Sequence, residues 1–430
     1  MMGVCLDDLS PVARRHFRRN FAMGVVNGAA YGVAETMIDS ALVMSWLVSQ
    51  LTGSSFIIGL ISPIRNAGWF LPQLFISGYA QRQERKMPIY HACSVVRSAS
   101  VALLAAAVWF LGPRHPAALL ACLLVLISLL ALGEGVSGIS FLDIVAKTIP
   151  ARRRGSFFAL RSFLGGVLAL GSSAAVRYVL SDASGLAFPS NFALLFTLAF
   201  VATTISVAGF SSIIEPVEPV DARNVPLLAQ LRRAWGFARR DRNFARLIGA
   251  RTLLVVGGGM ATPFYIVYAK DLLGAPASSV GTYLLTLTLS SILANLVWGR
   301  ISARYGNKMV ITLSAVAGLG APIAALAAGS AGSLPLFFLP FALQGVYQSS
   351  IMIGQVSFVL DIAPAGDRPI YIGLINTILG ITSLTLAASG LIVDALGYHA
   401  LFAIAALFFV LGLGAALGLH DPRAARPAAP

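Results

Sequence analysis

The sequence predicts an all-α integral membrane protein with twelve transmembrane helices in two pseudo-symmetric six-helix bundles. Composition gives the first observation, because the 430 residues are 57% hydrophobic and only 11% charged, against roughly 25% charge in ordinary soluble domains. The second is that apolar runs recur at lengths of about 20 residues, as a helix needs to cross a bilayer. The third is a repeat of loop motifs in the two halves of the chain.

Twelve apolar runs of the sequence are long enough to span a membrane as helices. The first follows the basic segment "ARRHFRRN" and is too long for the apolar core of a cleavable signal peptide, so we expect it to persist as a helix. The first, fourth and tenth runs exceed the minimum length, which favours tilting or kinks. The twelve predicted spans are 21–50, 56–79, 90–112, 117–145, 156–180, 190–213, 244–269, 278–299, 308–330, 334–361, 369–394 and 399–419.

Basic residues orient these spans. Of 31 Lys and Arg, 24 fall in the segments on the side of the N-terminus, and only Arg114, Arg177 and Lys270 fall in the opposite loops. The positive-inside rule then places both termini in the cytoplasm. We expect a multi-pass protein of the plasma or inner membrane, whose net charge of +14 meets anionic lipid and not nucleic acid.

One long polar segment divides the chain near its middle. It begins with Pro-rich linker and continues with Leu227, Leu231, Trp235 and Ala238 on one helical stripe, which predicts an amphipathic helix on the membrane surface. The expected domains are therefore an N-terminal bundle 1–213, a cytoplasmic linker 214–243 and a C-terminal bundle 244–430.

The two halves share loop motifs. "GYAQRQERKMP" starts at Gly78 after the second span, and "GRISARYGNKM" starts at Gly299 after the eighth. "IPARRRGSFFALRSFLGG" and "APAGDRPIYIGLINTILG" align when Pro150 is matched to Pro364. These offsets of 221 and 214 residues are about half the chain, as in alternating-access transporters built from duplicated halves.

These loops carry a family resemblance. "GRISARYGNK" resembles the signature of the major facilitator superfamily, with Ala303 in place of its Asp and Asn307 in place of one Arg; Gly78 remains in the weaker first copy. Asp361 and Arg368 resemble the acid-x6-Arg element that the family carries after its tenth helix. The positions that match the signature are Gly299, Arg304, Gly306 and Lys308.

The resemblance implies that these loop residues form a cytoplasmic gate. In such a gate glycines let helices approach closely, and basic residues pair with acids at neighbouring helix ends when that side is shut. Arg304 with Asp361 is the pair that the resemblance suggests. The alternative interpretation is that the basic residues only set the topology.

Ionisable residues within the spans are the candidates for function, because a charge at the bilayer centre costs about 2.5 to 3.5 kcal/mol or more. The acids are Glu35, Asp39 and Glu134, and we assign them to proton coupling. The bases are Arg65, Arg97, Arg161 and Arg251. Of these, Arg161 is close enough to the inner surface to snorkel.

The resemblance implies that helices 1, 4, 7 and 10 line a central cavity. Arg65, Arg97 and Arg251 are then candidate cavity residues together with Gln344, Gln348 and Gln355, whose spacings of four and seven put them on one helical face. The alternative for each is a structural ion pair or interhelical hydrogen bond, which is the favoured interpretation for Arg97.

Helix 7 contains "VVGGGMATPFYIVY". Gly257, Gly258 and Gly259, with Pro263 four residues on, weaken a helix. They predict a hinge that gates the cavity, or else close packing with a neighbouring helix.

These residues favour a proton-coupled secondary active transporter. The chain has no GxxxxGK[ST] motif for ATP hydrolysis, and burial favours the protonated form of a carboxylate. Glu35 and Asp39, four residues apart on one face of the first helix, suit this role, and Asp39 is preferred because it lies further outward. They look like the paired acids of proton-coupled multidrug antiporters of this superfamily, although helix 5 lacks the proline expected of many such antiporters.

We therefore expect export of an amphipathic small molecule by a monomer, without cofactor or metal. An organic-anion or nutrient transporter of the same fold and a non-transporting sensor or scaffold are the alternatives. An enzyme is not expected, because the chain lacks HExxH, a DDxxD-type cluster and a Ser/His/Asp grouping.

Overall fold

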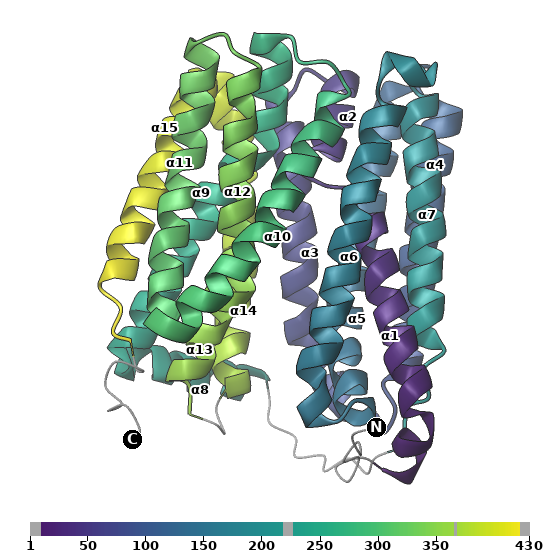
Figure 1. The fold of residues 1–430 in the computed structure, drawn as a ribbon, viewed down its shortest axis with the longest axis vertical. Coiled ribbons are helices and arrows are strands. Elements are labelled where there is room, and N and C mark those ends of the chain that lie inside the picture. The colour runs from purple at the N-terminus through teal and green to yellow at the C-terminus, as the bar shows by residue number, and fades with distance from the viewer. Residues whose placement is uncertain (1–9, 218–226, 365–367, 422–430) are drawn as a thin grey trace. The chain divides into compact units, whose positions relative to one another are not determined.

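The computed structural model describes residues 10–217, 227–364 and 368–421. Contacts divide the chain into two compact units (Figure 1). The N-terminal unit comprises Met1–Asp39 with Gly68–Asn224, and the C-terminal unit comprises Ser40–Ala67 with Val225–Pro430. Residues 40–67 thus belong to the unit that contains the second half of the sequence.

The N-terminal unit is a helical bundle. In it α4 packs on α5 and α7, and α1 packs on α6 and α7. Its elements are α1 (Pro11–Met37), the second half of α3 (Ser55–Gln81), α4 (Met87–Leu111), α5 (Pro116–Thr148), α6 (Ala151–Val179), a short 3-10 turn (Asp182–Ser184) and α7 (Ser190–Ser211).

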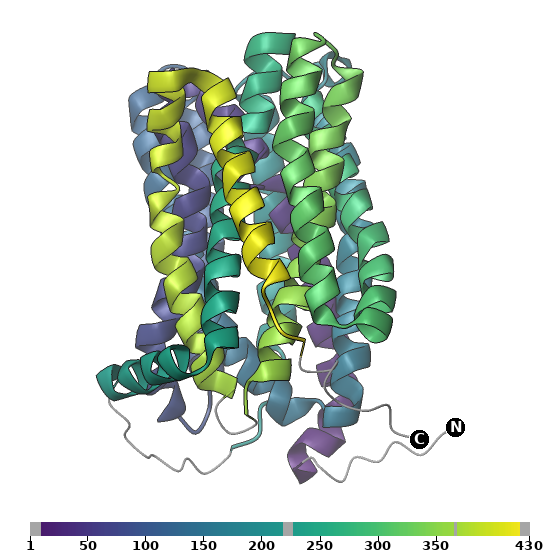
Figure 2. The same ribbon diagram turned by 90° about the vertical axis from the view of Figure 1, so that its left-hand side faces the viewer.

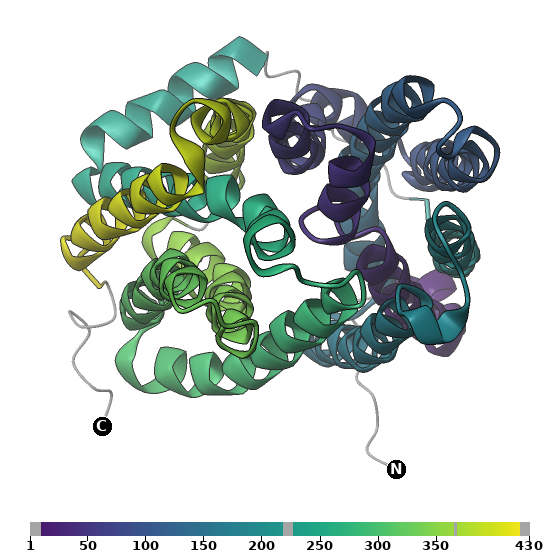
Figure 3. The same cartoon turned by 90° about the horizontal axis from the view of Figure 1, so that it is seen from above.

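The C-terminal unit is also helical. Its α12 packs between α10 and α11, and α15 packs on α9 and α11 (Figure 3). Its elements are α2 (Val43–Leu51), the first half of α3, α8 (Leu227–Arg240), α9 (Arg242–Leu273), α10 (Ser279–Tyr305), α11 (Asn307–Ser330), α12 (Phe338–Ser350), a π-helical turn (Ile351–Val356), α13 (Ser357–Ile362), α14 (Arg368–Thr385) and α15 (Ala388–Leu417).

All twelve predicted spans fall on helical chain. In the part that the structure describes, nine helices are long and apolar enough to cross a membrane. The last two predicted spans are joined through α15, which kinks at Gly397, where φ is 80°. Glycine tolerates this backbone conformation and other residues do so poorly.

The first span is interrupted, and the prediction of one helix over 21–50 is wrong. α1 ends at Met37 and α2 begins at Val43. Asp39 and Ser40 lie in the break, and the Ser45 hydroxyl donates to the Ser40 carbonyl at 3.1 Å. Asp and Ser offer the backbone alternatives to helical hydrogen bonding, which the apolar pattern around them hides. The break coincides with the boundary between the two units.

The predicted amphipathic helix of the linker is α8. Figure 2 shows it lying across the ends of the longer helices of its unit, and it packs on α9 and α14. Phe237 is tucked against Tyr371, with ring centroids 5.2 Å apart, whereas Trp235 is 51% exposed. Arg239 lies over the exposed Trp235 ring at 5.9 Å. The side chains of Leu227 and Leu231 lie outside the described residues.

Candidate functional site

A buried ion pair lies in the N-terminal unit. Arg97 Nη2 of α4 is 3.7 Å from Glu134 Oε1 of α5, and the two side chains are 7% and 5% exposed. This separation is longer than a hydrogen bond. The two charges therefore attract one another without being locked together, and the structural pairing considered for Arg97 has Glu134 as its partner.

Glycines on both sides of Glu134 make this pair possible. A Cβ on Gly133 would lie 3.0 Å from Arg97 Cγ, and one on Gly135 would collide with the Gly68 carbonyl of α3. The sequence "GEG" thus lets α3 and α4 approach α5 on either side of the acid. This local signal was available in the sequence.

α1 adds a second carboxylate to the pair. The Arg97 guanidinium carbon lies 5.8 Å from the centre of the Tyr31 ring, and the charge of Glu35, one helical turn further on, also acts on Arg97. Glu35 is half-buried. Glu134 is therefore the ion-pair partner of Arg97, and Glu35 is a second acid that acts on it more weakly.

Asp39 is placed differently from Glu35. It lies after the end of α1, so the prediction that the two acids share one face of a continuous helix is wrong. Asp39 is half-buried in the segment that connects α1 to α2.

The side chain of Arg161 on α6 contacts α1. The sequence analysis did not predict this contact, because it expected the side chain to extend to the inner membrane surface. Its Nη2 donates to Asn27 Oδ1 at 3.1 Å, and its guanidinium carbon is 4.7 Å from the centre of the Phe141 ring. A Cβ on Gly28 would collide with the Arg161 side chain. The pair "NG" at Asn27 and Gly28 is the feature of α1 that receives this arginine.

The C-terminal unit buries an arginine in another way. Arg251 of α9 is 5% exposed, and its Nε donates to Gln355 Oε1 at 3.2 Å. The neutral phenol of Tyr347 is the other polar group close to it. Among the residues that the structure describes, no carboxylate forms an ion pair with Arg251.

The three predicted glutamines do not share one environment. Gln344 is buried and its Nε2 donates to Thr262 Oγ1 at 2.7 Å; Gln355 is buried beside Arg251; Gln348 is exposed within its unit. The π-helical turn that contains Gln355 widens the helix locally and shifts the register relative to Gln348. Spacing alone could not show this.

α9 runs without a break through the predicted hinge and contains Pro263 in its interior. A Cβ on Gly257 would lie 2.9 Å from the Phe409 ring, and one on Gly258 would lie 3.0 Å from Tyr347. One on Gly259 would collide with Leu386. Close packing, the alternative weighed for these glycines, is thus present, and the hinge stays a prediction.

The second copy of the loop signature forms a turn between α10 and α11. Gly306 has a φ of 82°, and Asn307 at the start of α11 bridges two elements. Its Oδ1 accepts from the Ser302 hydroxyl at 2.6 Å, and its Nδ2 donates to Asp361 Oδ2 at 2.6 Å. Asn307, where the chain departs from the resembled signature, therefore contributes a hydrogen bond that positions Asp361.

The other predicted gate residues lie toward the ends of several helices, and the predicted cavity residue Arg65 lies in the interior of α3. Arg304 is exposed, with its guanidinium carbon 5.2 Å from the centre of the Tyr305 ring, and its pairing with Asp361 stays a prediction. Arg368 begins α14 and is exposed. Lys308 and Arg65 are half-buried, on α11 and α3; Gly299 and Gly78 lie on α10 and α3.

Each unit contains the same pair of hydrogen bonds between an Asn side chain and the backbone of a distant residue, which we call the Asn clasp. The sequence did not predict it. In the N-terminal unit, Asn20 Nδ2 donates to the Ile214 carbonyl at 3.1 Å and Asn20 Oδ1 accepts from the Ile214 amide at 3.0 Å. In the C-terminal unit, Asn243 makes the same two bonds with His420, both at 2.9 Å. These paired contacts are a structural trace of the internal repeat.

In each unit, the residue next in sequence after the one that the Asn contacts is an acid. The carboxylate of this acid lies beside the N-terminus of the third long helix of its half of the chain. Glu215 accepts from the backbone amides of Lys86 and Met87 at 2.9 and 2.8 Å, and from Lys147 Nζ at 3.1 Å. Asp421 lies so close to Gly306 that a Cβ there would collide with its carboxylate. Both acids lie where a helix N-terminus favours negative charge.

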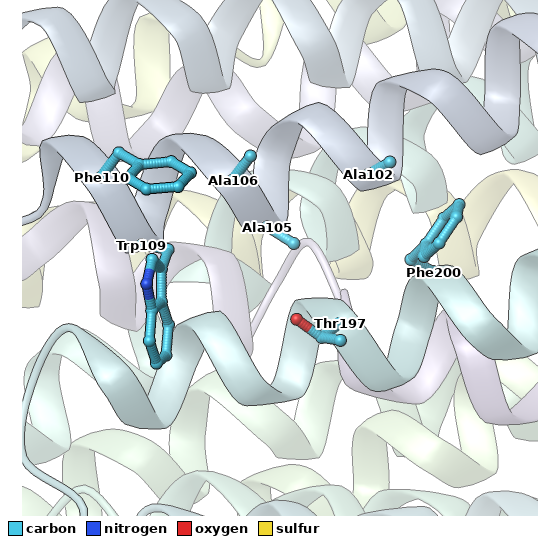
Figure 4. A pocket seen from close by; sticks show the side chains of 7 residues that line it. All are labelled: Ala102, Ala105, Ala106, Trp109, Phe110, Thr197 and Phe200. Carbon is cyan, nitrogen blue, oxygen red and sulfur yellow. The ribbon is translucent and has the colours of Figure 1, made fainter.

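A separate groove lies away from these charges. It has a volume of about 420 Å³ between α4 and α7 of the N-terminal unit (Figure 4), and Thr197 is the one polar residue among those that line it. Trp109 and Phe110 at its rim are 58% and 75% exposed. With so few polar groups, it cannot orient a polar ligand.

Comparisons with solved structures agree on the fold, which this chain shares with several membrane transporters. A solved structure of the nucleoside transporter NupG superimposes with a TM-score of 0.70 over 94% of this chain and 99% of that chain, at 14% identity. A D-xylose-proton symporter does so with a TM-score of 0.68 over 94% and 97%, also at 14% identity. A bacterial homologue of the iron transporter ferroportin gives 0.67 over 94% and 98%, at 13% identity.

Sequence comparisons agree with the structural ones. The sequence model of the Major Facilitator Superfamily matches residues 247–430. The chain is also 23% identical over 378 residues to the uncharacterized protein Rv2209 of Mycobacterium tuberculosis and to its counterpart Mb2232 of Mycobacterium bovis, which covers 86% of this chain and 71% of each relative. The family model thus agrees with the predicted resemblance over the C-terminal part of the chain, and the solved transporters confirm the predicted all-helical fold.

Proposed function

We propose that the protein is a proton-coupled secondary active transporter that works by alternating access. The observation that carries the proposal is the Arg97 cluster, in which a buried Arg97–Glu134 ion pair has a second acid, Glu35 of α1, close enough to act on it. The nearby Arg161 donates to Asn27 and lies over the Phe141 ring. Two carboxylates near one another are costly to ionise together, which favours binding of a proton by one of them.

The loose geometry of the pair supports exchange. A proton on Glu134 releases Arg97 toward Glu35, and loss of that proton restores the 3.7 Å pair. Because two arrangements of the same three side chains differ by one proton, the cluster is suited to couple protonation to a conformational change. Asp39, in the break after α1, is a further acid. It would move together with the end of that helix in a conformational change.

The finer parts of the proposal rest on sequence. Positive-inside charge favours both termini in the cytoplasm, in the plasma or inner membrane with lipid contact through α8. Paired acids near the first helix favour proton-driven export of an amphipathic small molecule, and a chain that holds both repeats favours a functional monomer.

The test is proton-driven transport by purified protein in liposomes. A pH gradient is imposed, and proton movement on addition of candidate substrates is followed with an entrapped pH indicator. We expect Glu35→Gln and Glu134→Gln each to abolish pH-driven flux, and Asp39→Asn to reduce it. Glu84→Gln, which changes an exposed acid in the loop between α3 and α4, is the matched control and should behave as wild type.

Wild-type flux in all three variants of Glu35, Glu134 and Asp39 would remove protons from the mechanism. Flux in the direction of the proton gradient, as in a symporter, would contradict export but keep the coupling.

A further inference from the structure

We propose that Arg251, Gln355 and Tyr347 form a subsite that binds one carboxylate of the transported molecule. The substrate is then an amphipathic organic anion. This inference rests on the transport function proposed above and adds the charge of the cargo to it.

The first step is the charge of Arg251. A buried cation is costly unless an opposite charge and hydrogen bonds compensate it. In the described part of the chain, the hydrogen bond of Arg251 goes to the neutral Gln355, although the side chain is 5% exposed. A fold retains such a group where function requires it. The missing charge is that of an anion.

The second step is the set of donors around it. The Nε2 group of Gln355 and the hydroxyl of Tyr347 are buried close to one another, and neither makes a hydrogen bond of good geometry to a described residue. Both residues are at most 3% exposed. Because the Nε of Arg251 is engaged by Gln355, its two Nη groups remain for a ligand. A carboxylate has two oxygens that accept several such donors at once, and guanidinium binds it in a fork.

The third step is how the fold brings these groups together. Gln355 lies in the π-helical turn that follows α12, and such turns are frequent at functional sites. Gly258 leaves room for the Tyr347 ring on α9, since a Cβ there would lie 3.0 Å from it. Tyr347 also packs edge-on against Phe409, with centroids 5.2 Å apart.

The surroundings favour an anion with an apolar body. Tyr347, Leu254, Phe409 and Leu379 belong to one buried apolar cluster, so the groups next to the donors are hydrocarbon. A cationic ligand would be repelled by Arg251. A neutral ligand would leave the buried charge uncompensated.

The experiment measures ligand binding to the full-length protein in lipid nanodiscs by the rise in unfolding temperature, because a ligand of the native state stabilises it. The probes share one apolar body and differ in the head group: phenylbutyrate, phenylbutyramide and phenylbutylamine. Wild type should be stabilised by phenylbutyrate alone. Arg251→Gln should bind it roughly tenfold or more weakly, as expected for loss of a hydrogen-bonded charge.

Further variants separate binding from folding. Arg177→Gln removes the same charge at an exposed site of the other unit and should bind phenylbutyrate as wild type. Tyr347→Phe keeps the packed ring and should weaken binding by roughly threefold, as one neutral hydrogen bond is lost. Arg251→Lys should fall between wild type and Arg251→Gln, because Lys keeps the charge but not the fork.

The proposal is overturned if the amide or the amine stabilises wild type as well as the carboxylate, if none of the probes stabilises it, or if Arg251→Gln and Tyr347→Phe bind as wild type. Equilibrium binding needs no proton gradient, so the outcome is independent of the proposed transport. Carboxylate binding without flux would remove the transporter and leave the subsite; pH-driven flux without carboxylate selectivity would do the reverse.

Discussion

Both units bury an arginine within a long helix, and they balance its charge in different ways. In the N-terminal unit Arg97 faces two carboxylates, one of them Glu134 at 3.7 Å. In the C-terminal unit Arg251 faces an amide and a phenol. The first cluster is complete without a ligand and can exchange a proton, whereas the second lacks an anion. The difference suggests that one unit handles the coupling ion and the other recognises the cargo.

The two units share one arrangement of contacts but differ in the helix that supplies the guanidinium. Both carry the Asn clasp and the acid at the start of the third long helix. Arg251 lies eight residues after the clasping Asn243, and the equivalent position eight residues after Asn20 is Gly28. Arg161 of α6 covers Gly28. A guanidinium therefore lies at the same level of α1 and of α9. On α9 it belongs to the helix itself, as Arg251, whereas on α1 it is supplied by Arg161 of α6.

The largest expected effect comes from unbalancing the N-terminal cluster. Glu134→Ala leaves Arg97 as a buried charge with one of its two acids removed, and it should lower the free energy of unfolding by about 3 to 5 kcal/mol. Arg251→Met should leave stability unchanged or raise it, because no acid loses its partner. Unfolding of both variants in detergent, followed by circular dichroism, measures the difference.

The control for this prediction is the double variant Arg97→Met with Glu134→Leu, which removes both charges and should recover most of the loss. If Arg251→Met costs as much as Glu134→Ala, Arg251 has a structural anionic partner and the comparison between the units fails.

A second prediction concerns the acids after the clasps. Glu215→Gln weakens bonds to two backbone amides and to Lys147 and should cost about 1.5 to 3 kcal/mol. Asp421→Asn should cost less, because Asp421 is half-buried whereas the Glu215 side chain is 2% exposed. Protease sensitivity of the loop before α4 provides a local measurement. Equal losses in the two variants would mean that burial does not set the strength of these contacts.

A third prediction compares glycines beside the two arginines. Gly135→Ala forces a methyl group against the backbone of α3 and should cost about 1 to 3 kcal/mol. Gly258→Ala meets only the edge of the Tyr347 ring at 3.0 Å, which can shift, so we expect less than about 1.5 kcal/mol but weaker carboxylate binding. Gly138→Ala, whose Cβ would lie 3.6 Å from Trp69, serves as the tolerant control on α5. A Gly135→Ala variant as stable as Gly138→Ala would contradict the close approach of α3.

Hydropathy and loop charge predicted much of the fold, because membrane helices are defined by composition and length. The break at Asp39 and Ser40 was hidden by the apolar residues on both sides. The in-span charges were found as candidates, but pairing depends on helix rotation, so Glu134 could not be assigned to Arg97. Glu215 and Asp421 were missed although each is followed by Pro in the sequence, since both lie outside the spans. The π-helical turn that contains Gln355 places it in a different environment from Gln348, and the spacing of the two residues in the sequence does not predict this turn.

The most direct test of this division of labour is to measure two kinds of transport by Glu35→Gln in liposomes. Carboxylate exchange at equal pH on both sides requires the C-terminal subsite but no net proton movement, whereas pH-driven accumulation requires the N-terminal cluster. The account predicts that Glu35→Gln retains phenylbutyrate exchange and loses pH-driven accumulation, while Arg251→Gln loses both. Accumulation by Glu35→Gln at the wild-type rate would contradict it.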